Sequence, residues 1–267
     1  MNRVVADITT TAPSRSRLRT MLTRSRDRKG AVAHSTMRLL PFTCAALFPL
    51  LAASAQTGFP FTDESLRYNL NWQAGTSLGE ATLTAHRSAV GWNLDVTLNA
   101  AVPGFSMADQ LHSAVDPGLC SQEFERDLTQ GGKRTDEKTS FDQKAGSATR
   151  TTLFPAGGGK TDFNIATCAR DALAFTDYAR VELGQGRVPA PQQVYFGSAY
   201  SVTLSYAGAE NVTSGGKSVA TDRVHATVKG PKADFQCDIF FARDAARTPL
   251  SIRIPLPLGV FSLDLVR

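Results

Sequence analysis

The chain has 267 residues, 42% hydrophobic and 20% charged, and this composition excludes a disordered or fibrous protein. The formal net charge is +5, but nine of the 29 basic and only two of the 24 acidic residues lie in residues 1–55, so the remainder carries 20 basic against 22 acidic residues. A basic excess confined to a removable leader does not indicate a nucleic-acid partner, and we expect none.

The first 55 residues predict a leader and a signal peptide. Residues 1–36 are rich in Arg, Ser and Thr and are expected to be a disordered leader or the product of a mis-assigned start codon. Residues 37–55 contain a short positive region, an apolar run over residues 39–52 and a small-x-small ending, which together predict cleavage between Ala55 and Gln56. The apolar run is too short to cross a membrane as a helix, which takes about 20 residues.

A cleaved signal peptide predicts export. We therefore expect a single β-rich domain over residues 56–267, located in the periplasm or associated with the outer membrane. Nothing later in the chain reaches the length of a transmembrane helix, so the mature protein is expected to carry no transmembrane segment, while peripheral membrane association stays open.

Period-two alternation of apolar and polar residues recurs along the mature chain and predicts about a dozen strands with one buried face. The alternation is cleanest from Trp92 to Ala100, and glycine pairs or triplets such as Gly157–Gly159 mark turns. Strands are expected over residues 66–72, 78–85, 92–100, 111–115, 122–128, 138–141, 148–154, 200–206, 223–228, 235–241, 250–254 and 260–265.

One segment has helical spacing instead. Ala172, Leu173, Thr176, Ala179 and Leu183 predict a helix over about Arg170 to Leu183, and the glycines that follow offer a C-terminal stop. A single central helix among many strands predicts a mainly β fold, a strongly curved antiparallel sheet or open β-barrel with the helix packed against it.

Three cysteines remain after cleavage, in a compartment where disulfides persist. Cys120 and Cys168 both lie at the edges of expected elements, and we predict a disulfide between them. Cys237 alternates with apolar residues on one strand face and is expected to be a buried free thiol.

Short sequence patterns along the chain resemble one known family. The patterns are Glu64, Leu66, Tyr68 and Trp72 with Gly79, then Asp171, Leu173 and Arg180, then Ala242-Arg243-Asp244 with Arg247, Pro249 and Gly259. They resemble the exported bacterial family of domains of unknown function numbered three thousand one hundred and eight. The resemblance implies a periplasmic or outer-membrane-associated β protein without assigned activity. It also implies an architecture similar to the periplasmic lipoprotein carrier (LolA-like) fold, an incomplete barrel with an apolar concavity and a helical lid.

No pattern of catalytic, cofactor-binding or metal-ligating residues is found in the sequence. His86, His112 and His225 are dispersed and have no partner at metal-site spacing. Asp171 and Arg180 are the polar residues of most interest, and two interpretations stay open for them: an ion pair between helix and sheet edge, or contact with a ligand head group.

Three hypotheses for function remain. The first is a non-catalytic binding module for a hydrophobic, acyl or lipid-like ligand, whose apolar face includes Trp72, Trp92, Leu94 and Val96, although the same residues would also make a filled core. The second is a structural or assembly protein at the outer membrane that binds an envelope protein through edge strands or an exposed helix. The third is a hydrolase. No cofactor is expected in any of them.

Overall fold

The computed structural model describes residues 63–72, 75–102, 105–256 and 259–266. The expected leader, signal peptide and cleavage site at Ala55 and Gln56 lie outside the described residues. The elements in chain order are β1 Glu64–Trp72, β2 Thr76–Arg87, β3 Trp92–Val102, β4 Phe105–Val115, β5 Ser121–Gln130, β6 Lys133–Asp142, β7 Ser147–Phe154, β8 Lys160–Asn164, β9 Arg170–Asp171, α1 Ala172–Gly184, β10 Gln192–Tyr195, β11 Ala199–Ser214, β12 Lys217–Lys229, β13 Asp234–Ala242, β14 Pro249–Leu256 and β15 Gly259–Val266.

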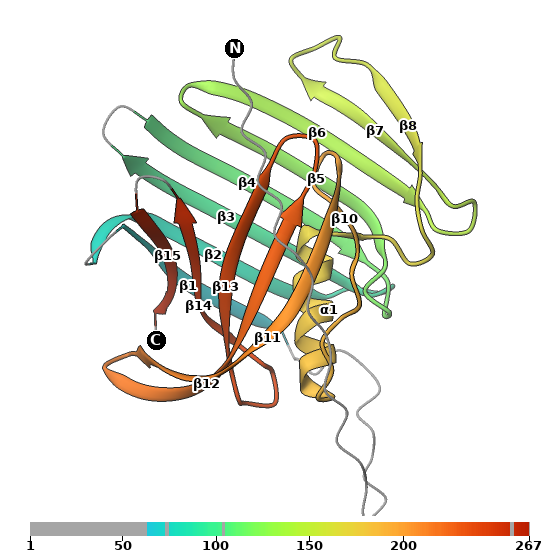
Figure 1. The fold of residues 1–267 in the computed structure, drawn as a ribbon. Coiled ribbons are helices and arrows are strands. Elements are labelled where there is room, and N and C mark those ends of the chain that lie inside the picture. The colour runs from blue at the N-terminus through green and yellow to red at the C-terminus, as the bar shows by residue number, and fades with distance from the viewer. Residues whose placement is uncertain (1–62, 73–74, 103–104, 257–258, 267) are drawn as a thin grey trace, which may run out of the picture. The chain divides into compact units, whose positions relative to one another are not determined.

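All of these strands belong to one sheet that does not close (Figure 1). The strand order is β8-β7-β6-β5-β4-β3-β2-β1-β15-β14-β13-β12-β11-β10-β9, so the first and last strands of the domain, β1 and β15, pair at its centre. Every pair is antiparallel except β9 with β10, which is parallel. The expected mainly β fold with one helix is confirmed, as a large curved sheet whose two ends stay unpaired with each other.

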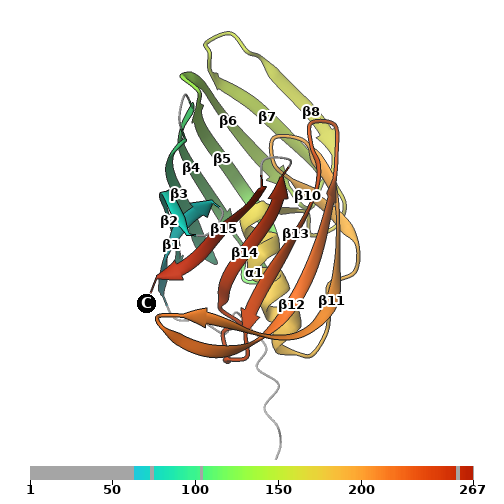
Figure 2. The ribbon, with the colours of Figure 1, turned by 60° about the vertical axis from the view of Figure 1, so that its left-hand side comes forward.

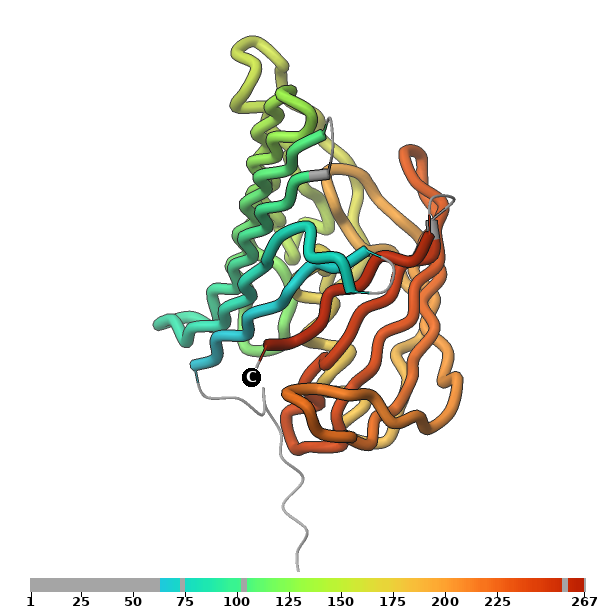
Figure 3. The backbone as a smooth tube through the Cα atoms, turned by 90° about the vertical axis from the view of Figure 1, so that its left-hand side faces the viewer, coloured from blue at the N-terminus to red at the C-terminus, as the bar shows by residue number. Residues whose placement is uncertain are grey.

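The sheet folds into two walls, β1–β8 and β10–β15, and α1 lies between them (Figures 2 and 3). On one side the helix packs against β10–β13, where Phe175, Ala179 and Leu183 contact a cluster that includes Val224 and Phe241. On the other side it packs against β2–β4, where Ala174 contacts a second cluster; that cluster comprises Ala85, Trp92, Leu94, Val115 and Leu119. Burial on both sides makes α1 part of the interior.

Gly79 in β2 shows why the sequence folds this way locally. A Cβ atom at this position would lie 2.0 Å from the carbonyl oxygen of Asn99 and 2.6 Å from the Cα of Ala100 in β3. The register of β1 against β2 also shifts between Leu70 and Asn71, beside this glycine. Only glycine allows this close approach of two backbones.

The elements that the alternation did not predict are short or lack alternation. β8 begins at Lys160, directly after the triple glycine, and β9 occupies Arg170–Asp171, where the sequence predicted the first helical turn. β10, at Gln192–Tyr195, follows a proline-rich stretch and pairs with β11 and β9.

Cys120 and Cys168, the two cysteines paired from the sequence, form a disulfide in the structure. Cys237 is a free thiol, 8% exposed, within the cluster between α1 and β10–β13. Burial raises the pKa of Cys237 to about 11, which makes it a packing residue rather than a reactive one.

Candidate binding site

Asp171 begins the helix and fixes it to the sheet. Its side chain is fully buried, and its Oδ1 accepts hydrogen bonds from the backbone amides of Leu173 and Ala174 at 2.8 and 3.1 Å. Its Oδ2 accepts from the hydroxyls of Ser113 and Ser121, on β4 and β5, at 2.5 and 2.6 Å. Burial raises the pKa of this carboxyl, and the four hydrogen bonds partly offset that rise. Both oxygens are occupied, so Asp171 acts as a helix cap.

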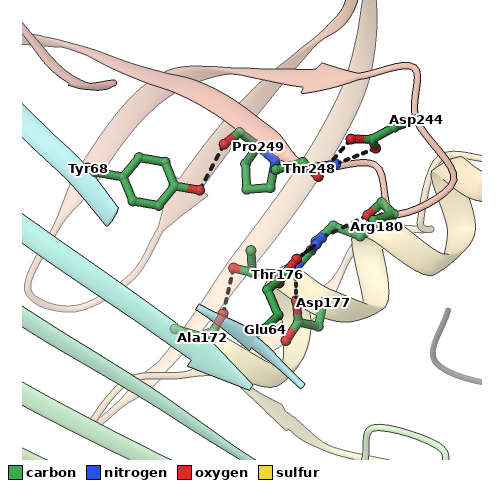
Figure 4. A network of polar contacts seen from close by, with 10 residues as sticks. Glu64, Tyr68, Ala172, Thr176, Asp177, Arg180, Asp244, Thr248 and Pro249 are labelled. Carbon is green, nitrogen blue, oxygen red and sulfur yellow. Dashed lines mark hydrogen bonds and ion pairs between the residues drawn. The ribbon is translucent and has the colours of Figure 1, made fainter. Parts of the chain in front are cut away.

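Arg180 joins the same helix to β1 and to the turn between β13 and β14 (Figure 4). Its two terminal nitrogens donate to both oxygens of Glu64 on β1 at 2.8 Å, and one of them also donates to Asp177 at 2.8 Å. Its Nε donates to the carbonyl of Ala246, in the turn between β13 and β14, at 3.1 Å. Arg180 is 3% exposed, so this is a buried ion-pair network between helix and sheet. Asp171 and Arg180 therefore act separately, the first as a cap and the second as a bridge.

Little room remains where the helix meets the sheet. A cavity of about 50 Å³ lies there, between residues of β1–β3 that include Leu66 and Leu83 and residues of α1 that include Thr176 and Arg180. This volume is far below the roughly 300–1,000 Å³ that small-molecule sites usually have. The helix thus fills this end of the interior.

The four residues expected to form an apolar ligand face lie in different surroundings. Trp92 and Leu94 are 5% and 2% exposed and pack in the cluster against α1, so they belong to the filled core. Val96 borders the small cavity beside the helix. Trp72 lies at the far end of β1, where its ring stacks on Phe261 of β15 with centroids 6.0 Å apart.

A larger cavity lies on the same inner face, on the side of the sheet where β1 and β15 meet. Its volume is about 320 Å³, at the lower end of the usual range for small-molecule sites. Side chains from six strands, β1–β4, β14 and β15, form its lining, and all but one are apolar. The lining residues are Leu70, Leu78, Leu98, Ala100, Phe105, Met107, Ile254, Phe261, Ser262 and Leu263.

The alternation on β3 explains how one strand serves both the filled core and the cavity. Trp92 and Leu94 point to the same face as Leu98 and Ala100, but only the first two lie under the helix. The alternation predicted this inner face, but the sequence did not indicate where the helix would end. Phe105 and Met107 were missed because the strand was expected to start only at residue 111, whereas β4 begins at Phe105.

The inner face turns polar beyond the cavity, along β4–β7. Asp109 on β4 is 8% exposed, and Arg126 on β5 forms a buried ion pair with Glu137 on β6, with the Arg126 Nε to Glu137 Oε2 distance 3.0 Å. Arg150 on β7 donates to the carbonyl of Gly197, in the turn between β10 and β11. Arg126 and Glu137 of this wall are thus paired inside the fold, next to an apolar cavity.

No group of three or more His, Cys, Asp or Glu side chains within the described ranges is placed to hold a metal ion. Over the same ranges, no helix has the length and apolar character that crossing a membrane requires.

One comparison with a solved structure agrees with this architecture. The "beta-barrel-like protein of domain of unknown function DUF1849" from Brucella abortus, a crystal structure, aligns over 78% of this chain and 97% of its own, with 9% identity and a TM-score of 0.58. That likeness shows the fold alone. The Mycobacterium tuberculosis lipoprotein LppX aligns over 75% of this chain and 84% of its own at 13% identity, with a TM-score of 0.25, which is too low to indicate a shared fold. No curated protein is significantly similar to the chain.

The family model "Protein of unknown function (DUF3108)" matches residues 67–266, which run from β1 to the last residue of β15. The chain belongs to the DUF3108 family of proteins of unknown function.

Proposed function

We propose that this protein is an exported cell-envelope protein that binds a hydrophobic, acyl or lipid-like molecule without transforming it. The observation that carries the proposal is the apolar cavity of about 320 Å³ on the inner face of the sheet. Burying apolar surface there is favourable by about 25 cal/mol per Å². Because the lining offers almost no polar group, a ligand held there would be selected by apolar character and size.

Binding fits the lining better than hydrolysis does. Ser262 is the one hydroxyl among the described lining residues, and its Oγ donates to Asp264 at 2.5 Å. A serine nucleophile needs a base that removes its proton and an oxyanion site, and a histidine is the usual base. None of the described lining residues is a histidine.

Export is supported by the Cys120–Cys168 disulfide, because disulfides persist in oxidising compartments such as the periplasm. The expected signal peptide over residues 37–55 points the same way.

A pair of variants on one strand tests the binding proposal. Ala100 lines the cavity, whereas Ala101 is exposed on the opposite face of β3, so Ala100→Phe fills the cavity and Ala101→Phe serves as the matched control. The probe is N-phenyl-1-naphthylamine, whose fluorescence rises in apolar sites. We expect the native protein and Ala101→Phe to bind it, and Ala100→Phe to bind at least tenfold more weakly. Equal binding by both variants would refute the cavity as the site.

The second candidate function, assembly through a protein partner, is favoured by one feature. β8 is the terminal strand of the described sheet and pairs only with β7, and most of its residues are exposed. Such an edge can accept a strand from another chain. The exposed-helix form of this hypothesis is wrong, because α1 is buried between the two walls. Assembly would be supported if the protein captures one envelope protein, and if this capture is lost in Thr161→Pro on β8 but kept in Ala100→Phe in the cavity.

A further inference from the structure

Asp109 is a buried carboxyl that is only partly hydrogen-bonded within the described part of the chain. It is 8% exposed and lies on β4. Its Oδ2 accepts a hydrogen bond from Nε2 of Gln130 at 2.7 Å, while its Oδ1 is buried without a hydrogen-bond partner among the described residues. Burial raises the pKa of this carboxyl; the Gln130 side chain and the Thr129 backbone offset part of the rise. A buried acceptor left unpaired costs about 1–3 kcal/mol, so it calls for an explanation.

The position of Asp109 links this oxygen to the apolar cavity. Asp109 is the register partner of Leu98 across β3 and β4, and it follows Met107 by two residues on the same face of β4. Leu98 and Met107 both line the cavity. The carboxyl therefore stands directly beyond the lining.

A second hollow continues on the other side of Asp109. It is lined by Phe105, Leu128, Gln130, Lys133 and Thr135, and it shares Phe105 with the apolar cavity. Leu128 is the register partner of Asp109 on β5, and Gln130 is its hydrogen-bond partner. Asp109 itself lines neither hollow, but its two register partners do: Leu98 lines the apolar cavity and Leu128 lines the hollow with polar side chains. This arrangement suits a molecule with one apolar and one polar end.

We propose that Asp109 recognises the polar end of the ligand, an acyl-chain molecule whose head group donates a hydrogen bond. This inference rests on the proposed function. The chain occupies the apolar cavity, and a hydroxyl or amide N–H of the head donates to Oδ1 of Asp109. Burial makes this carboxyl selective against head groups that cannot donate a hydrogen bond. The guanidinium of Arg126, whose charge also acts on Asp109, is already bound to Glu137.

Two probes of equal chain length separate this inference from the proposed function. 1-Dodecanol carries a hydroxyl donor, and dodecyl methyl ether carries only an acceptor; each is titrated against bound N-phenyl-1-naphthylamine. A hydrogen bond to a charged group corresponds to a preference of about tenfold or more. We expect the native protein to prefer the alcohol by that factor, and Asp109→Leu to bind both probes equally. Asp109→Asn keeps the side-chain shape and so controls for a folding defect in Asp109→Leu. It should show a reduced preference for the alcohol over the ether.

Asp127→Asn is the matched control, because Asp127 lies on the neighbouring strand β5 and is bonded to Arg134 near the surface. It should keep the native preference. Equal binding of alcohol and ether by the native protein, or a preference retained in Asp109→Leu, would overturn the role of Asp109 while leaving the cavity as a binding site. Failure of the native protein to bind any of the three apolar molecules would overturn both proposals.

Discussion

Replacing Arg180 by alanine should destabilise the fold strongly, because it leaves two carboxyls in the interior without their cation. Glu64 and Asp177 have side-chain exposures of 17% and 11%, and the Arg180 side chain between them is 3% exposed. Arg180→Ala removes three hydrogen bonds to carboxylate oxygens and one to the carbonyl of Ala246.

The magnitude follows from the burial of the network. Removing one partner of a buried ion pair costs about 3–5 kcal/mol. A domain of this size loses about 2–4 °C in Tm per kcal/mol, so the expected drop is about 6–20 °C. The control is Arg187→Ala, just beyond the same helix, where Arg187 pairs with Glu182 but is 57% exposed. Loss of an exposed pair costs about 0–1 kcal/mol, and so at most about 4 °C.

Thermal unfolding of both variants, followed by circular dichroism at pH 8 and pH 5, checks this reasoning. Arg180 partly offsets the rise that burial causes in the pKa of Asp177, so without Arg180 the Asp177 carboxyl should be neutral at pH 5, and the deficit should be larger at pH 8 than at pH 5. If Arg180→Ala loses no more stability than Arg187→Ala, the network does not hold the helix in place.

Three further changes have expected outcomes. Burial raises the pKa of Asp177 from its ordinary value of 3.8 to about 6, so the free energy of unfolding should fall as the pH rises from about 4 to about 6. Asp177→Asn should remove about 3 kcal/mol of that fall, as measured by urea titrations across this pH range. Reducing the Cys120–Cys168 disulfide, or replacing both cysteines by alanine, should cost about 2–5 kcal/mol in the same assay, and an unchanged midpoint would show that the bridge is dispensable. Gly79→Ala should lower the Tm by several degrees because its Cβ would meet the Asn99 carbonyl oxygen, and a neutral result would mean that β2 and β3 separate without cost.

The sequence predicted the features that depend on neighbouring residues. Alternation from Trp92 to Ala100 predicted both the strand β3 and its buried face, and helical spacing after Arg170 predicted α1 to within two residues at its start and one at its end. β9 was missed because two residues cannot show a period, and β10 because its residues do not alternate.

The candidate site could not be predicted, because it depends on contacts between distant segments. The cavity exists where β1 pairs with β15, so that Leu70 lies opposite Leu263. It also requires that α1 cover Trp92 and Leu94 and leave Leu98 uncovered. All three residues occupy equivalent positions in the alternation of β3, so local sequence could not distinguish a core position from a lining position.

Native mass spectrometry of the protein purified after expression of the full chain tests the central claim most directly. If the cavity binds a lipid-like molecule, the native protein should carry an added mass that an organic solvent extracts, Ala101→Phe should carry the same mass, and Ala100→Phe should lack it. Recovery of the native protein and both variants at bare polypeptide mass, with no lipid in the extract, would contradict the account.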